Sequence, residues 1–165
     1  MTIAENIEIR NVTVADLPAI AAMERVCFTD PWSEQSLRAV LQDPAHWFFI
    51  AAHSGQEICG YGLASTVSDE GEIANLAVSP AARRRGIGAA LLCMLIQMLM
   101  AGGAQRAYLE VRVSNEAARK LYAKTGFQNI GLRKNYYTAP REDAIVMCKE
   151  LPAQPAGRMR KEGKI

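Results

Sequence analysis

Apolar positions recur along the chain with two different periods, so the sequence predicts strands and helices together. From Ile7, apolar residues alternate with polar ones, which is typical of a strand with one buried face. Thr13 and Asp16 have the spacing of a helix capping box, and Ser33 is placed to cap a second, shorter helix. Two apolar runs are then separated by the residues 54–56, Ser-Gly-Gln, which predicts a hairpin.

The second half of the chain alternates more regularly between helix and strand. Residues 86–101 are apolar on nearly every face, so this helix is expected to be buried against a sheet, and Gly102 with Gly103 ends it. The expected strands are 7–12, 47–53, 57–67, 72–78, 106–113, 127–136 and 144–149, and the expected helices are 14–27, 33–43, 86–101 and 115–124. This order predicts an α/β fold, with a mixed sheet and helices on both sides.

Length and composition change this picture little. A chain of 165 residues, half of them apolar, is expected to form one domain over residues 1–150. Residues 151–165 contain prolines and a basic cluster, and are expected to form a flexible basic tail. The N-terminus lacks the pattern of a secretory signal, and the longest apolar stretch, 87–101, is too short to span a bilayer. A cytoplasmic protein is therefore predicted.

Charge and cysteine content narrow the function classes. The net charge is +2, and most of the basic excess lies in the tail, so the rest of the chain is nearly neutral. This argues against a nucleic-acid-binding surface, which needs clustered Lys and Arg over a face. The cysteines are widely spaced without a CxxC pair, so we expect mostly buried thiols and no zinc site or disulfide; they are Cys27, Cys59, Cys93 and Cys148.

A short loop before the apolar helix carries the clearest chemical signal. Its residues are Arg83, Arg84, Arg85, Gly86, Ile87, Gly88 and Ala89. Backbone N–H groups at a helix N-terminus, unobstructed at the glycines, form an anion site, and the arginines suit a diphosphate. The alternative is a solvated basic turn before an ordinary helix.

Two better-known phosphate loops do not fit. A P-loop requires Lys-Ser or Lys-Thr after its glycines, and neither follows here. The dinucleotide-binding fingerprint requires a third glycine where this chain has Leu91. It also requires the glycine loop to follow a strand directly, whereas Gly86 lies well beyond the strand expected to end at Val78. Glu110 only imitates the acidic residue that binds ribose in that fold.

Several segments in order resemble the GNAT acetyltransferase superfamily. The motif R-x-x-G-x-G is preceded by NLAVSP and followed by LEVRVSNEAARKLYAKTGF. PWSE at 31–34, RKNYY at 133–137 and REDA at 141–144 further resemble the RimI-type enzymes, which acetylate the N-terminal alanine of a small-subunit ribosomal protein. The resemblance covers about residues 5–150. It implies the acyl-CoA N-acyltransferase fold, a mixed, mostly antiparallel sheet with helices on both faces, and acetyl-CoA as the co-substrate.

The resemblance also implies where acetyl-CoA binds. Its pyrophosphate would meet the amides of 84–89, and its pantetheine arm would run along Leu76, Ala77 and Val78. An N–H group near Val78 would stabilise the oxyanion formed in acyl transfer. Asn115 matches a further cofactor contact, while its alternative role is to cap the helix that follows. No metal is indicated.

For catalysis, the resemblance assigns Glu110 as the general base and Tyr122 as the general acid. A tyrosine with a pKa near 10 is protonated at neutral pH and suits protonation of a leaving thiolate. The alternatives are an ion-paired glutamate on a strand and a core aromatic residue on a helix.

The peptide site is implied by the resemblance at two segments. Its residues are Pro31, Trp32, Tyr136, Tyr137, Glu142 and Asp143. Glu142 and Asp143 would receive a basic residue of the peptide, and their alternative is a charged turn. Two other functions stay open: acetylation of lysines or small polyamines, and a ribosome- or RNA-associated binding protein that uses the basic tail and has a vestigial CoA site.

Overall fold

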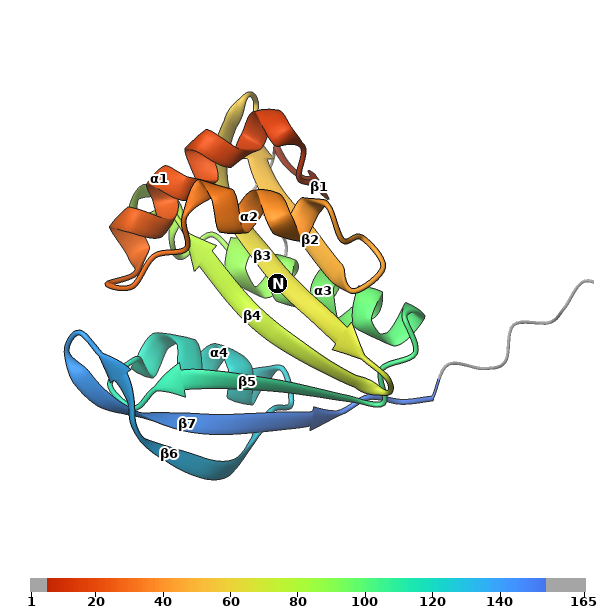
Figure 1. The fold of residues 1–165 in the computed structure, drawn as a ribbon, viewed down its shortest axis with the longest axis vertical. Coiled ribbons are helices and arrows are strands. Elements are labelled where there is room, and N and C mark those ends of the chain that lie inside the picture. The colour runs from red at the N-terminus through yellow and green to blue at the C-terminus, as the bar shows by residue number, and fades with distance from the viewer. Residues whose placement is uncertain (1–5, 154–165) are drawn as a thin grey trace, which may run out of the picture.

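The computed structural model describes residues 6–153 (Figure 1). The strands are β1 (Ile7–Asn11), β2 (Trp47–Ser54), β3 (Glu57–Val67), β4 (Glu70–Val78), β5 (Arg106–Arg112), β6 (Gln128–Thr138) and β7 (Arg141–Glu150). The helices are α1 (Leu17–Cys27), α2 (Glu34–Leu41), α3 (Ile87–Ala101) and α4 (Glu116–Lys124), with 3-10 turns at Val14–Asp16 and Pro80–Ala82. The expected order of elements is confirmed. The tail expected at 151–165 lies outside the described residues from 154 onward.

Local capping signals explain why the first two helices begin where they do. The Thr13 backbone N–H donates to the Asp16 carboxylate over 2.8 Å, which confirms the capping box, although the first turn is 3-10 and not α. The Ser33 hydroxyl accepts from the Ser36 N–H over 3.1 Å and caps α2.

All seven strands form one sheet in the order β1-β2-β3-β4-β5-β7-β6. Neighbours run antiparallel except β4 and β5, which are parallel. The parallel pair is joined over three residue pairs, the last of which is Glu72 with Tyr108. Beyond that pair β4 and β5 diverge, as Figure 1 shows, while β5 stays paired with β7 along its whole length. The mixed, mostly antiparallel sheet is therefore confirmed, with one interruption near its centre.

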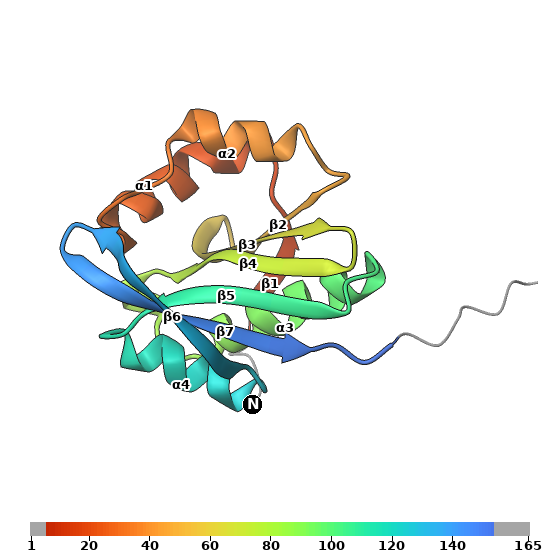
Figure 2. The same cartoon turned by 60° about the horizontal axis from the view of Figure 1, so that its bottom comes forward.

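Helices cover both faces of the sheet, as expected (Figure 2). Helices α1 and α2 pack on one face over β2, β3 and β4, and α3 and α4 lie on the other. Helix α3 is buried as predicted, with Leu91, Leu95 and Leu99 fully covered. Its close approach to the sheet depends on the absence of a side chain at Gly62, where an added Cβ would lie only 2.7 Å from Leu95. This packing fixes the start of α3 beside the end of β4.

The cysteines are free thiols, but they are less buried than expected. Cys59 is buried, Cys27 and Cys148 are half-buried, and Cys93 is exposed on α3. The expectation of mostly buried thiols is wrong for Cys93, because one narrow face of an otherwise apolar helix points to solvent. Within residues 6–153, no helix has both the length and the apolar character needed to cross a bilayer.

Candidate active site

The stretch of β4 that has left β5 presents unpaired backbone groups. The Ser79 N–H donates to the Cys59 carbonyl on β3 over 2.9 Å. Because hydrogen-bonded positions alternate in an antiparallel ladder, Leu76 and Val78 direct their N–H and C=O groups away from β3. These groups face the side from which β5 has diverged, and of the four only the Val78 carbonyl has a nitrogen donor, the Arg83 side chain. An extended amide-containing ligand can pair with such an edge.

The loop between β4 and α3 gathers backbone donors. Arg84 and Gly86 adopt left-handed conformations, with φ of 65° and 77°, and Gly86 is the N-cap of α3. The first N–H of the helix to find a backbone acceptor is that of Ala90, which donates to Gly86 over 3.1 Å. Within the described chain, the six N–H groups of 84–89 have no acceptor. Together with the helix dipole, they form a site for an anion.

The three arginines of this loop are not equivalent. The Arg83 side chain donates to the Val78 carbonyl over 3.1 Å and so ties the loop to the end of β4. Arg84 and Arg85 are exposed and make no hydrogen bond or ion pair with other residues of the described part. They are therefore the two arginines available to a phosphate group.

Asn115 begins α4 and acts as its cap. Its side-chain oxygen accepts from the Ala118 N–H over 3.2 Å. The capping role expected for this residue is confirmed. Its contact with a cofactor stays a prediction.

Glu110 lies near the middle of β5 and is held by two side chains of β6. Because Leu109 and Val111 are buried in the core with α3 and α4, Glu110 points to the opposite face. Its carboxylate accepts from the Tyr136 hydroxyl over 3.0 Å and pairs with the Arg133 guanidinium over 3.1 Å. The side chain is 19% exposed. Glu110 is thus a fixed, ion-paired carboxylate that solvent still reaches.

Tyr122 lies on α4, on the face of the sheet opposite to Glu110. Its side chain is buried and meets the Phe127 ring edge-on, with the centroids 5.9 Å apart. Burial and the neighbouring Tyr137 raise the pKa of Tyr122 to about 12. Among residues 6–153 its hydroxyl has no hydrogen-bond partner. The Tyr122 hydroxyl is therefore protonated at neutral pH. The alternative interpretation, a core aromatic residue on a helix, also agrees with this position.

Glu110 and Tyr122 do not hydrogen-bond each other. Two adjacent tyrosines lie near them: Tyr136 donates to Glu110, and Tyr137 contributes to the raised pKa of Tyr122. The rings of Tyr136 and Tyr137 meet edge-on at 5.0 Å. The β6 residues assigned to the peptide site therefore each influence one of the two residues assigned to catalysis.

Arg112 at the end of β5 joins the two segments assigned to the peptide site. Its guanidinium stacks over the Tyr137 ring at 4.2 Å and donates to the Pro140 carbonyl over 3.1 Å. It also donates to the Thr29 hydroxyl over 3.2 Å, in the segment that follows α1. Sequence patterns alone did not identify this contact, because Arg112 and Thr29 are 83 residues apart.

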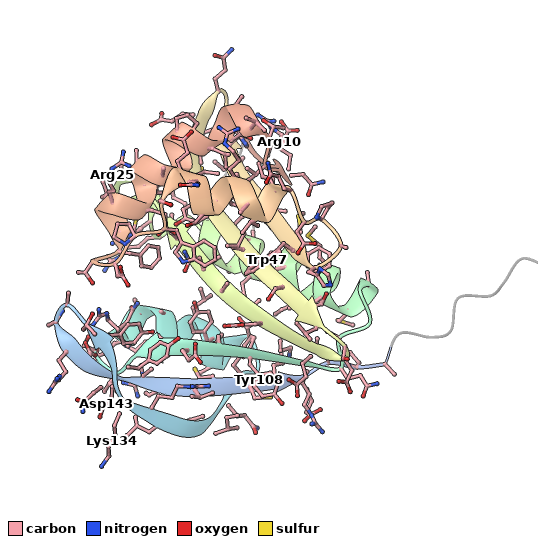
Figure 3. All side chains as sticks on the ribbon, viewed as in Figure 1. Arg10, Arg25, Trp47, Tyr108, Lys134 and Asp143 are labelled. Atoms are coloured by element: carbon pink, nitrogen blue, oxygen red, sulfur yellow. The ribbon has the colours of Figure 1, made fainter. Side chains whose placement is uncertain are left out.

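The acidic residues of the β6–β7 hairpin have partners within the chain. The Glu142 carboxylate accepts from the Ser114 N–H over 2.7 Å and from its hydroxyl over 2.8 Å. These hydrogen bonds, with the Arg112 guanidinium, lower the pKa of Glu142. Asp143, labelled in Figure 3, accepts from the Asn135 N–H over 2.8 Å. These contacts agree with the alternative interpretation of Glu142 and Asp143 as part of a charged turn. A role of these carboxylates in peptide binding stays a prediction.

The segment that contains Pro31 and Trp32 is anchored by a carboxylate that sequence reasoning missed. Glu24 on α1 is fully buried and accepts from the Trp32 N–H over 3.0 Å. It also accepts from the Tyr61 hydroxyl on β3 and the Asn75 amide on β4. Burial, the largest influence, raises the pKa of Glu24 in spite of these donors. The signal was present, because Glu24 continues the apolar face of α1 that contains Leu17, Ile20 and Ala21.

No three His, Cys, Asp or Glu side chains within residues 6–153 are grouped so that they could hold a metal ion.

Comparison with known proteins gives consistent results. The profile of the Acetyltransferase (GNAT) family matches residues 17–127. The [ribosomal protein bS18]-alanine N-acetyltransferase of Escherichia coli (strain K12) is 38% identical over 142 residues, which cover 85% of this chain and 95% of that protein. The N-alpha-acetyltransferase RimI of Mycobacterium tuberculosis is 36% identical over 152 residues, covering 88% and 94%. The crystal structure of the ribosomal-protein-S18-alanine N-acetyltransferase from Escherichia coli superposes with a TM-score of 0.80 at 32% identity, covering 93% of this chain and 98% of that one.

Proposed function

The chain belongs to the GNAT family of acetyltransferases, and on this premise we propose that it acetylates the N-terminal alanine of a small-subunit ribosomal protein. Relatives at 34–38% identity over most of the chain are named for this reaction on ribosomal protein bS18, which supports the choice of acceptor. The observation that carries the proposal is the divergence of β4 from β5. It leaves unpaired backbone groups beside an anion loop and the Glu110 carboxylate.

The residues around this divergence fit acetyl-CoA, which supplies an acyl group activated as a thioester. The six N–H groups of 84–89 suit a pyrophosphate, and Arg84 and Arg85 add positive charge beside them. The N–H and C=O groups of Leu76 and the N–H group of Val78 suit the amides of a pantetheine arm. The loop directly follows this edge of β4 along the chain. A ligand whose diphosphate binds the loop can therefore place the attached arm along the edge.

Glu110 and Tyr122 take the two proton-transfer roles in this proposal. Glu110 accepts the proton that the amine loses, and its orientation is fixed by Tyr136 and Arg133. Tyr122 gives a proton to the departing thiolate, since its raised pKa keeps the hydroxyl protonated in the physiological range.

The chemistry of amines favours an N-terminus over a lysine. An α-amino group with a pKa near 8 is about one-tenth neutral at pH 7, whereas a lysine with a pKa near 10.4 is neutral in fewer than about one in a thousand molecules. A single carboxylate base such as Glu110 therefore deprotonates an α-amino group more readily than a lysine. This supports the α-amino group as the acceptor.

The proposal is tested with short peptides that begin Ala-Arg, Ser or Met, and with an N-terminally blocked peptide that contains an internal lysine. Acetyl transfer from acetyl-CoA is measured by mass spectrometry, and fragmentation locates the modified nitrogen. We expect transfer confined to the free N-terminal alanine. Transfer to the lysine of the blocked peptide, or to no peptide, would contradict the acceptor assignment and direct the search to lysines or small amines.

A further inference from the structure

A second carboxylate lies at the point where β4 and β5 part. Glu72 on β4 pairs in register with Tyr108, the last residue of β5 that pairs with β4; Figure 3 labels Tyr108. Because the adjacent Ile73 is buried in the core with α3, Glu72 points to the other face of the sheet. Glu110 is the next residue of β5 on that same face. Two carboxylates, one from each strand, therefore face the start of the divergence.

Glu72 differs from Glu110 in its partners. Both oxygens of Glu110 are engaged, one by Tyr136 and one by Arg133, whereas Glu72 makes no hydrogen bond or ion pair within the described part of the chain. Glu72 is also exposed, so a ligand can reach it. An exposed carboxylate without a partner, beside one that is fixed, is available to a cation that arrives with the substrate.

The charged surroundings support this arrangement. Although Glu72 is exposed, partial desolvation by neighbouring groups and the charge of Glu110 raise its pKa, and Arg133 lowers it. Glu72 also contributes to the raised pKa of Tyr136. The titratable and charged groups that face Glu72 are Glu70 on its own strand, Tyr108 and Glu110 on β5, and Arg133 and Tyr136 on β6; its partner on β3 is the uncharged Ser65.

We propose that Glu72 and Glu110 together bind the ammonium form of the incoming amine, and that Glu72 sets the affinity of the enzyme for that amine. This inference rests on the proposed function. An amine with a pKa near 8 reaches the site mostly protonated at neutral pH. A carboxylate on each side of it compensates its charge until one proton is lost to Glu110. Glu72 then faces the neutral amine, and the lone pair left on nitrogen attacks the thioester carbonyl carbon. The C–S bond breaks, the leaving thiolate takes the proton of Tyr122, and the second proton lost by nitrogen is returned to Tyr122 through solvent.

The test compares Glu72→Gln with Glu70→Gln. Glu70 lies on the same strand and the same face, but pairs in register with Arg106 at the closed end of the β4–β5 pair. We expect Glu72→Gln to raise KM for the amine about five- to tenfold and to leave KM for acetyl-CoA unchanged, because only the amine contact is lost. Glu70→Gln is expected to match the wild type, and Glu72→Asp to recover part of the affinity.

The pH dependence separates binding of a cation from a structural effect. Since the pKa of Glu72 is raised, its carboxylate is neutralised at a less acidic pH than an ordinary glutamate. The wild-type KM for the amine should therefore rise as pH falls through that pKa, and this rise should be smaller in Glu72→Gln. An unchanged KM for the amine in Glu72→Gln, or an equal effect in Glu70→Gln, would overturn the inference.

The assay uses whichever amine the wild-type enzyme acetylates best, so the two proposals fail separately. If the wild type modifies only lysine or a small amine, the acceptor assignment fails and the Glu72 test proceeds with that amine. If the wild type modifies the N-terminal alanine and Glu72→Gln does so with the same KM, only the role of Glu72 fails.

Discussion

Tyr122 illustrates how a single buried residue can serve both packing and chemistry. Its ring packs against Phe127, while its hydroxyl has no partner within residues 6–153. The hydroxyl oxygen is not sealed from solvent, because His53 Nε2 is the one side-chain atom of residues 6–153 that is both buried and without a partner. The raised pKa of about 12 keeps the Tyr122 hydroxyl protonated at neutral pH, as the proposed role of proton donor requires.

Substitution of Tyr122 by Phe keeps the ring packed against Phe127 and removes the hydroxyl group that carries the proton. We expect kcat to fall about a hundredfold, which is the lower end for loss of a general acid. The affinity for acetyl-CoA, measured by calorimetry, should change little because the ring contacts remain. In the wild type, kcat should show no alkaline decline from Tyr122 until pH approaches 12. A large loss of acetyl-CoA affinity in the variant would contradict the role as proton donor.

Gly86 offers a second test at the scale of one residue. Its φ of 77° strains any other residue, and it precedes the free N–H groups of α3. We expect Gly86→Ala to weaken acetyl-CoA binding at least about tenfold by shifting these donors. Gly55→Ala is the matched control, because Gly55 has a φ of 62° and open space around its Cα, far along the chain in the β2–β3 turn. Equal losses in both variants would point to general strain instead.

At the scale of elements, Glu24 connects α1 to two strands and to the segment after the helix. Its partners Tyr61, Asn75 and Trp32 come from β3, β4 and the residues after α1. Removing the carboxylate leaves the buried Tyr61 hydroxyl and two half-buried donors without an acceptor, at a cost of about 1–3 kcal/mol for a buried donor. The position of Trp32 in the assigned peptide site therefore depends on a contact inside the core.

We expect Glu24→Ala to lower the free energy of unfolding by about 3 kcal/mol or more, measured by urea denaturation. Glu34→Ala is the control, because Glu34 makes only an exposed pair with Arg38 and should cost less than about 0.5 kcal/mol.

The pH dependence of the free energy of unfolding should also reflect the buried Glu24 carboxyl group. Since burial raises the pKa of Glu24 above 4.5, the folded protein holds its proton more tightly than the unfolded chain. Its contribution to stability is therefore present below about pH 4.5 and is lost as pH rises through the raised pKa. Glu24→Gln should remove that loss, and an unchanged profile would contradict the assignment.

Most elements were predictable because their signals are local. The Thr13 capping box, the Ser33 cap and the glycines that bound α3 act within a few residues, and the structure confirms their positions. Glu24 and Arg112 were not recognised, because their partners are up to 51 and 83 residues away and no periodicity encodes such contacts. The catalytic roles of Glu110 and Tyr122 were assigned only through resemblance, since a glutamate on a strand and a tyrosine on a helix are ordinary residues.

At the scale of the whole molecule, two groups of strands meet through one short seam. Strands β1–β4 form one antiparallel group and β5–β7 another, and three residue pairs of β4 and β5 join them. Arg112, through Thr29, connects the far end of β5 to the segment after α1. A ligand that pairs with β4 beyond the seam would add hydrogen bonds where the sheet has none.

Acetyl-CoA is therefore expected to stabilise the whole fold and to protect defined amides. At one hundred times its Kd, it should raise the free energy of unfolding by about 2.7 kcal/mol. Hydrogen exchange should slow at Leu76, at Val78 and across 84–89, while the β2–β3 turn at Gly55 serves as the unaffected reference. Protection spread evenly over the molecule, without these amides, would contradict the assigned binding edge.

The interruption between β4 and β5 also has a kinetic meaning. The anion loop and Tyr122 lie on the side of α3 and α4, whereas Glu110 and Glu72 point to the side of α1 and α2. If acetyl-CoA and the amine bind as proposed, they arrive from opposite sides of the sheet and do not compete for one entrance. Both can be present at once, so double-reciprocal plots at several fixed concentrations of the second substrate should intersect, as in a sequential mechanism, and should not run parallel.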